Sequence, residues 1–166
     1  MSTDAPAVAR DLLGALDVPM FVATLAVDGE RSGCLVGFSS QASIHPPRYA
    51  VWISDKNHTH GVAAVADVLA VHFLSPDDVA LASRFGEETG DEVDKFADLA
   101  WTPGPDGVPL LDGVPDRFAG RVVHRVPTGD HTVHLLAPIE ETVSASERWR
   151  QLGFQATKPL EPGHPA

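Results

Sequence analysis

The chain has 166 residues, of which 43% are hydrophobic and 21% are charged. These proportions are typical of a globular domain and exclude a disordered or fibrous protein. The formal net charge of −11 argues against a general nucleic-acid or anionic-membrane surface, because both partners are themselves negative and would be repelled.

The length suits one folded domain, which we expect over residues 1–150, with residues 151–166 as a flexible C-terminal extension. Cys34 is the only cysteine, so no intrachain disulfide can form and a reducing, cytoplasmic location is expected. No apolar stretch reaches the ~18 residues that a membrane span requires, and no signal-peptide pattern is present.

The first half of the chain carries both helix and strand signals, without regular alternation between them. Val8, Leu12, Leu13 and Leu16 are spaced by three and four residues, which predicts an amphipathic helix of about three turns. Residues 20–27 and 31–38 read as two strands joined by a tight turn at 28–29. Residues 39–47 are small and polar and end in Pro-Pro, which predicts a loop.

The pattern continues with a strand over 49–54, a turn at 55–57 and a short helix over 59–66. A strand over 69–74 precedes a helix that should begin at Ser75-Pro76 and run to about Phe85, where Gly86 ends it. After a Gly/Pro-rich segment at 103–109, two long strands are predicted over 117–126 and 131–140. The tail from 158 to 166 is expected to be disordered.

Six or so strands with only short helices predict a mainly β fold, an antiparallel barrel rather than a doubly wound sheet. The spacing of Gly29, Gly33 and Gly37 supports this choice, because it does not form the Gly-x-Gly-x-x-Gly turn of a dinucleotide-binding fold. A nicotinamide cofactor would therefore have to bind without that turn.

Residues 56–60, Lys-Asn-His-Thr-His, lie between a predicted strand and a predicted helix. Amides at such a corner, together with a lysine and polar side chains, suit a phosphate group, although an ordinary helix cap with a solvated lysine gives the same pattern. His58 and His60 have no evident third and fourth metal ligands, so no metal site is predicted. His131 and His134 should point to opposite faces of a strand. A serine hydrolase is disfavoured because no Gly-x-Ser-x-Gly turn occurs.

Four segments, in this order and spacing, carry a resemblance to a known family: Gly33 to Pro47, ending Ser-Ile-His-Pro-Pro; Lys56 to His60; Leu81 to Phe85 with Asp94-Lys95-Phe96; and Gly129-Asp130-His131. The chain resembles the flavin reductase family over roughly residues 12–142. The resemblance implies an antiparallel split β-barrel of the FMN-binding type. It also implies FMN or FAD as the flavin and NAD(P)H as the electron donor.

The resemblance also implies the site residues. It assigns His131 to the nicotinamide side as the catalytic residue. Cofactor-binding roles fall on Gly37, Phe38, Ser39, Ser40, Gln41 and Ser43 along the flavin ring, on Ser54, Lys56, Asn57, Thr59 and His60 at the phosphate, and on Arg84 and Phe85 at the border. Where the family commonly has an Ala-Asn-Ser-Phe-Thr-Ser-like run, this chain has Val-Gly-Phe-Ser-Ser-Gln at 36–41, so backbone amides would replace two polar side chains.

The resemblance thus predicts NAD(P)H-dependent reduction of flavin by a homodimer, with a flavin-dependent oxygenase as a possible recipient of the reduced flavin. Two alternatives stay open at this point. One is a non-catalytic FMN carrier or sensor, and the other is a split-barrel oxidoreductase that holds FMN tightly and acts on an organic substrate.

Overall fold

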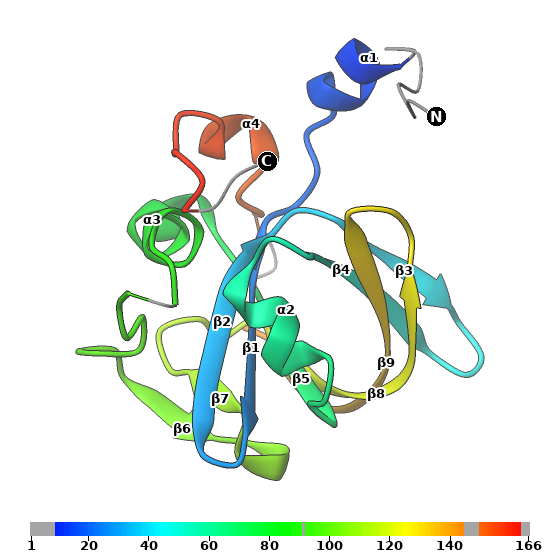
Figure 1. Cartoon of the computed structure of the whole chain (residues 1–166), viewed down its shortest axis with the longest axis vertical. Coiled ribbons are helices and arrows are strands. Elements are labelled where there is room, and N and C mark those ends of the chain that lie inside the picture. The colour runs from blue at the N-terminus through cyan, green and yellow to red at the C-terminus, as the bar shows by residue number, and fades with distance from the viewer. Residues whose placement is uncertain (1–8, 91, 145–149, 164–166) are drawn as a thin grey trace.

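A seven-stranded antiparallel sheet forms the body of the protein in the computed structural model, which describes residues 9–90, 92–144 and 150–163. The strand order is β2-β1-β5-β8-β9-β4-β3, and Figure 1 shows the sheet curling until β2 and β1 face β9 and β4 across the interior. The strands are β1 (Phe21–Val27), β2 (Glu30–Val36), β3 (Ser39–Ser43), β4 (Arg48–Ser54), β5 (Val68–Phe73), β8 (Arg117–Pro127) and β9 (His131–Thr142). The mainly β, antiparallel split-barrel fold is confirmed.

The first hairpin shows how local sequence sets the register. Asp28 and Gly29 have φ values of 51° and 84°, a conformation that a two-residue hairpin turn requires and that glycine adopts without strain. The turn places Val27 opposite Glu30, and the pairing continues to Phe21 opposite Val36. Cys34 and Val36 therefore point into the barrel, while Gly33 and Leu35 point outward.

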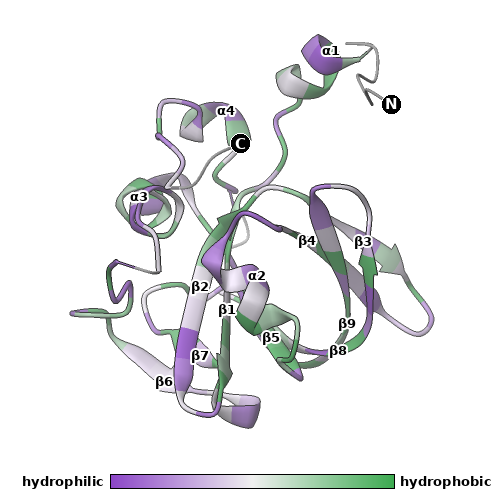
Figure 2. Cartoon of the chain, in the orientation of Figure 1, coloured by the Kyte–Doolittle hydropathy of each residue, from purple (hydrophilic) through white to green (hydrophobic). Residues whose placement is uncertain are grey.

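The barrel interior is apolar and is covered at one end by helix α2 (His58–Ala63). Val62 and Ala63 of this helix join the same buried cluster as Phe21, Val51 and Leu136, which come from three different strands. Figure 2 shows the hydrophobic colour along β1 and β4, which line this interior. Burial of this cluster is the main favourable contribution to folding.

A second core lies on the outer face of β1 and β2, against two of the remaining helices. It packs Val22 and Met20 against Phe85 of α3 (Val79–Glu87) and against Leu152, which precedes α4 (Phe154–Thr157). A small hairpin of β6 (Trp101–Pro103) and β7 (Pro109–Leu111), joined through a 3₁₀ turn at Pro105–Gly107, completes this layer. The sequence predicted only a Gly/Pro-rich segment there.

The loop predicted over 39–47 is wrong for its first half, because residues 39–43 form β3 and pair with β4. Residues 40–42 are exposed, as suits an edge strand whose backbone is satisfied by one neighbour while its polar side chains meet water. Only residues 44–47 form the turn.

The helix predicted from Ser75 to Phe85 is also corrected. It begins as a 3₁₀ turn at Pro76–Asp78, capped by Ser75, and α3 then runs through Gly86 to Glu87. Gly86 does not end the helix. A Cβ atom at Gly86 would lie 2.9 Å from Cδ2 of Leu35, so this glycine lets α3 pack closely on β2.

Two terminal segments differ from expectation. Helix α1 (Arg10–Ala15) has six residues rather than three turns, and Val8 lies outside the described residues. In the extension predicted to be flexible, Leu152 is 2% exposed and Gly153 pairs with Pro19, so residues 150–163 contact the body. Residues 164–166 lie outside the described part of the chain.

Candidate active site

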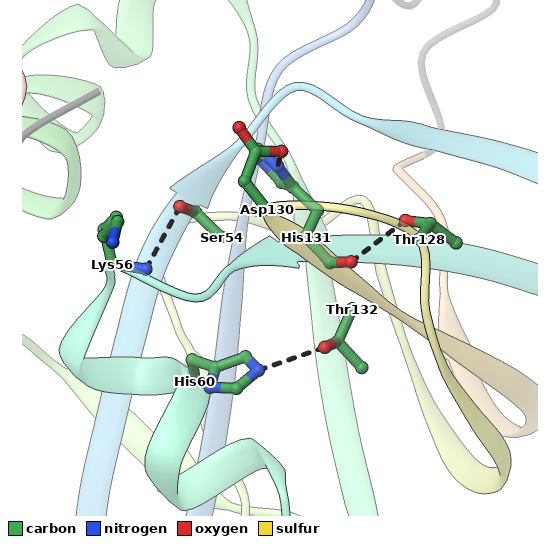
Figure 3. Close-up of polar contacts among 7 residues, drawn as sticks. All are labelled: Ser54, Lys56, His60, Thr128, Asp130, His131 and Thr132. Atoms are coloured by element: carbon green, nitrogen blue, oxygen red, sulfur yellow. Dashed lines mark hydrogen bonds and ion pairs between the residues drawn. The ribbon is translucent and has the colours of Figure 1, made fainter. Parts of the chain in front are cut away.

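Three loops that are distant in sequence meet at one edge of the barrel. The Trp52 amide donates to the Phe38 carbonyl at 2.9 Å, which ties β4 to the link between β2 and β3. The Asp55 amide donates to the Asp130 carbonyl at 2.9 Å, which ties the end of β4 to the turn between β8 and β9. Lys56 and His131 are therefore held on neighbouring segments (Figure 3).

The lysine cavity, as we name it, lies where these loops meet and has a volume of about 650 Å³. Its polar side is formed by Ser54, Lys56, Asn57, Asp130 and His131. Its other lining residues are mostly apolar: Met20, Cys34, Leu35, Val36, Gly37, Phe38, Trp52, Ile53, Phe154 and Pro162. An apolar chamber of this size with a few convergent polar groups is typical of a cofactor site.

A second chamber, the α1 cavity, adjoins the first and has a volume of about 670 Å³. It is bordered by Leu13 and Leu16 near α1, by Ser39 and Ser40 of β3, and by Thr128. The two cavities share six lining residues: Gly37, Phe38, Trp52, Asp130, His131 and Phe154. Two ligands in these chambers would therefore meet at the shared wall.

His131 is oriented by its neighbour at this shared wall. Nδ1 of His131 lies 2.7 Å from Oδ1 of Asp130, and the Thr128 hydroxyl donates to the His131 carbonyl at 2.9 Å. The hydrogen bond from His131, followed by the charge of His131, lowers the pKa of the exposed Asp130 carboxyl. Because the carboxylate accepts from Nδ1, the opposite nitrogen, Nε2, is left as the acceptor in the neutral ring.

The rings of Phe38 and His131 lie against each other, with centroids 4.8 Å apart and planes tilted by 37°. Phe38 is 58% exposed although it is large and apolar. A ring in this position offers an apolar face to a planar ligand, and it keeps the imidazole at the boundary between the cavities.

The predicted phosphate segment is only partly directed toward the lysine cavity. The Lys56 amide donates to the Ser54 hydroxyl at 3.3 Å, and the Asn57 side chain accepts from the Thr59 amide at 3.0 Å, which makes Asn57 the helix cap. Thr59 is 1% exposed and its hydroxyl lies 3.0 Å from that of Ser32, so it faces the barrel interior. The structure does not bring Thr59 to the cavity wall.

Five other predicted residues make contacts elsewhere. The Nε2 atom of His60 lies 3.1 Å from the Thr132 hydroxyl (Figure 3), and the Arg84 guanidinium donates to the Ala97 carbonyl at 2.7 Å. Phe85 is 1% exposed in the second core. Farther along β3, the Gln41 side chain donates to the Ser43 carbonyl at 3.4 Å, and the Ser43 side chain is only partly buried.

Sequence reasoning missed Trp52, Phe154 and Pro162. Trp52 lies in a predicted apolar strand. Successive side chains of a strand point to opposite faces, but the sequence does not show which face borders a cavity. Phe154 and Pro162 belong to the segment expected to be flexible, and no local pattern indicates that this segment returns to the cavity.

Cys34 lies against the lysine cavity but is 1% exposed. Burial raises the pKa of its thiol to about 11, so the thiol stays protonated at neutral pH and is a weak nucleophile. Among residues 9–90, 92–144 and 150–163, no three His, Cys, Asp or Glu side chains are grouped so that they could hold a metal ion. Within the same residues, no helix is long and apolar enough to cross a bilayer.

The structure thus combines a split antiparallel barrel with an apolar, lysine-bearing cavity beside an oriented histidine. The family described as "Flavin reductase like domain" matches residues 14–154, and the chain belongs to it. The predicted family is thus confirmed.

Relatives of known name support the enzymatic class. The chain is 30% identical over 125 residues to FMN reductase (NADH) SmoA of Agrobacterium fabrum. The aligned region covers 75% of this chain and 69% of that protein. It is 25% identical over 129 residues to the 4-hydroxyphenylacetate 3-monooxygenase reductase component of Salmonella typhimurium, covering 77% and 76%. The predicted enzyme class, an NAD(P)H-dependent flavin reductase, is confirmed at the level of these relatives.

The fold is also similar to that of a solved structure, a flavin reductase domain protein from Arthrobacter sp. FB24. The TM-score is 0.78 at 20% identity, over 95% of this chain and 93% of that one. This likeness concerns the fold.

Proposed function

We propose that this protein transfers a hydride from NAD(P)H to FMN or FAD, and that the flavin occupies the lysine cavity. The observation that carries the proposal is the convergence of Phe38, Lys56 and His131 on one cavity in a member of the flavin reductase-like family. These three residues are far apart in the sequence, so only the tertiary fold brings them to one cavity.

The residues present fit a flavin. Trp52, Leu35 and Phe38 line an apolar space of about 650 Å³, which suits the planar ring, while Lys56 supplies a cation at the polar side for a phosphate. When bound, the flavin supplies a ring that accepts a hydride, and the protein contributes binding, orientation and charge stabilisation.

We assign the nicotinamide to the α1 cavity. The cavities share Phe38 and His131, so ligands in both could reach the contact distance that hydride transfer requires. The roles follow from this arrangement. His131, oriented by Asp130, contacts the nicotinamide side, and the apolar walls exclude water from the reacting rings.

We further propose a homodimer that passes reduced flavin to a separate oxygenase. Leu12, Leu13 and Leu16 of the α1 region are 68%, 62% and 47% exposed, and a second copy of the chain would bury them. The named monooxygenase reductase component among the relatives supports the partner class.

The direct test is NADH and NADPH oxidation, followed at 340 nm with and without added FMN, FAD or riboflavin. Steady oxidation that depends on added flavin supports a reductase that uses flavin as a substrate. Flavin binding without NAD(P)H oxidation would contradict the proposal and support a carrier or sensor.

A second candidate is an oxidoreductase that retains FMN and reduces an organic substrate. The apolar character of the α1 cavity, with Leu13, Leu16 and Trp52 in its walls, favours this alternative over a carrier. It requires a protein that purifies yellow and turns over with an organic acceptor in the absence of free flavin.

A further inference from the structure

Residues 158–163, Lys-Pro-Leu-Glu-Pro-Gly, which we call the strap, follow α4 and return toward the body of the protein. They lie beyond residue 154, where the match to the family model ends. Two prolines restrict the backbone of the strap, which lowers the conformational entropy lost when it docks.

Two hydrogen bonds, both donated by backbone amides of the strap, hold it against the end of α3. The Glu161 amide donates to Oε1 of Glu87 at 3.0 Å, and the Gly163 amide donates to the Gly86 carbonyl at 3.0 Å. The Ser83 hydroxyl contacts the other carboxylate oxygen of Glu87 and orients the group. Leu160 adds an apolar contact with the second core.

The docking depends on a glycine at position 163. A Cβ atom there would lie 2.5 Å from the Glu87 carbonyl oxygen and 2.8 Å from its carbon. Both contacts are with backbone, which cannot move aside as a flexible side chain can. Any larger residue would therefore lift the strap from α3.

Between these two hydrogen bonds, Pro162 forms part of the wall of the lysine cavity. The cavity that holds Lys56 and Asn57 is therefore bounded on this side by a segment attached mainly through surface hydrogen bonds. Such a segment can open at a low free-energy cost compared with the strands of the barrel.

We propose that the strap is a retention element for the flavin: docked, it slows dissociation of FMN from the lysine cavity, and its release from α3 lets the flavin exchange. This inference rests on the proposed function. A docked strap would make the flavin a slowly exchanging bound group, whereas a released strap would let the flavin pass through as a substrate.

The test uses three variants of the full chain and one truncation. Gly163→Ala and Glu87→Gln weaken the docking, a variant that ends at Leu160 removes Pro162 but keeps the Leu160 contact, and Gly113→Ala is the matched control, since a Cβ at Gly113 meets no atom within 4 Å. The FMN dissociation rate is measured by stopped-flow fluorescence after dilution, and circular dichroism checks that each variant is folded.

We expect dissociation to accelerate about three- to tenfold in Gly163→Ala, the effect of losing the neutral hydrogen bond between the Gly163 amide and the Gly86 carbonyl, and at least as much in the truncation. Gly113→Ala should match the unmodified protein. The rate of flavin reduction at saturating FMN and NADH should be unchanged in folded Gly163→Ala and Gly113→Ala, because neither substitution changes a residue of the cavity wall.

The possible failures are distinguishable. Suppose that the unmodified protein reduces FMN, and that folded Gly163→Ala and the folded truncation release FMN as slowly as the unmodified protein does. The strap then does not retain the flavin, and the proposed function stands. If the unmodified protein binds no FMN and oxidises no NAD(P)H, the proposed function fails and the strap inference fails with it.

Discussion

At the scale of single residues, the proposed chemistry depends on His131 and Lys56. Both are polar groups at the edge of an apolar space, and both are held by backbone contacts from neighbouring loops. Their roles can be separated, because one is assigned to the nicotinamide side and the other to the flavin phosphate.

Replacement of His131 by Ala should slow reduction of bound flavin by about tenfold or more and leave flavin affinity nearly unchanged, because the reacting rings lose an orienting contact. Single-turnover absorbance at 450 nm after mixing with NADH measures the rate, and fluorescence titration measures affinity. His124→Ala, at an exposed histidine on β8, is the control. A reduction rate equal to that of the control would remove His131 from the site.

Replacement of Lys56 by Ala should weaken FMN binding by about ten- to a hundredfold, since a charge-assisted hydrogen bond contributes roughly 1.5–3 kcal/mol. Riboflavin lacks the phosphate, so its affinity should barely change. Lys56→Arg keeps the charge and should restore most of the FMN affinity. Equal losses for FMN and riboflavin would mean that Lys56 supports the local fold rather than the phosphate.

At the scale of elements, α1 is the least supported helix of the described chain. It has no buried residues, and its contacts with the body include hydrogen bonds from the Gln155 side chain to the Gly14 and Leu16 carbonyls. In Figure 1 it projects from the barrel near α4. An apolar helix in this position is expected to pack against a second copy of the chain.

Light scattering at micromolar concentration should therefore give about twice the 17.6 kDa chain mass. The double variant Leu12→Ser, Leu13→Ser removes apolar area from the expected contact and should shift the protein toward monomer. Val65→Ser is the control, because Val65 is equally exposed, at 66%, but lies just after α2. A monomeric unmodified protein that binds flavin would refute the dimer.

At the scale of the whole molecule, the stability of the fold should fall in acid because of two buried histidines. Burial is the main cause that lowers the pKa of His72 to about 3 and that of His134 to about 4. His72 is held in one tautomer, since Nδ1 donates to the Val22 carbonyl and Nε2 accepts from the Leu111 amide. Protonation of His72 at Nε2 would place that N–H against the N–H of Leu111, so two hydrogen-bond donors would face each other.

The unfolded chain, with an ordinary histidine pKa near 6.5, binds more protons than the folded chain between pH 6.5 and 3. The contribution of His72 to the free energy of unfolding should thus be constant above about pH 7 and fall by about 2 kcal/mol between pH 7 and 5. Urea unfolding at both pH values measures this difference. A glutamine at position 72 can keep both hydrogen bonds but does not titrate. The His72→Gln variant should therefore lose about 2 kcal/mol less unfolding free energy between pH 7 and 5 than the unmodified protein. An equal loss in both proteins would show that His72 is not the cause.

Local sequence alone determined much of the architecture. The Asp28-Gly29 pair indicated the first hairpin because few other residues adopt two consecutive positive φ values, and short apolar runs rich in β-forming residues indicated strands β1, β4 and β5. The order and spacing of four short motifs determined the family. These signals are short-range, so they can be found without knowing how the chain folds back on itself.

Only the tertiary structure decided what forms the site. Thr59 and Phe85 lie in predicted functional motifs but face the interior, because a side chain's direction depends on the face of the barrel on which its element packs. Phe154 and Pro162 reach the cavity because Leu152 is buried in the second core and the strap binds α3, contacts with residues about 70 or more positions away in the sequence. No local pattern encodes such distant contacts, since their formation depends on the complementary surfaces of the packed elements.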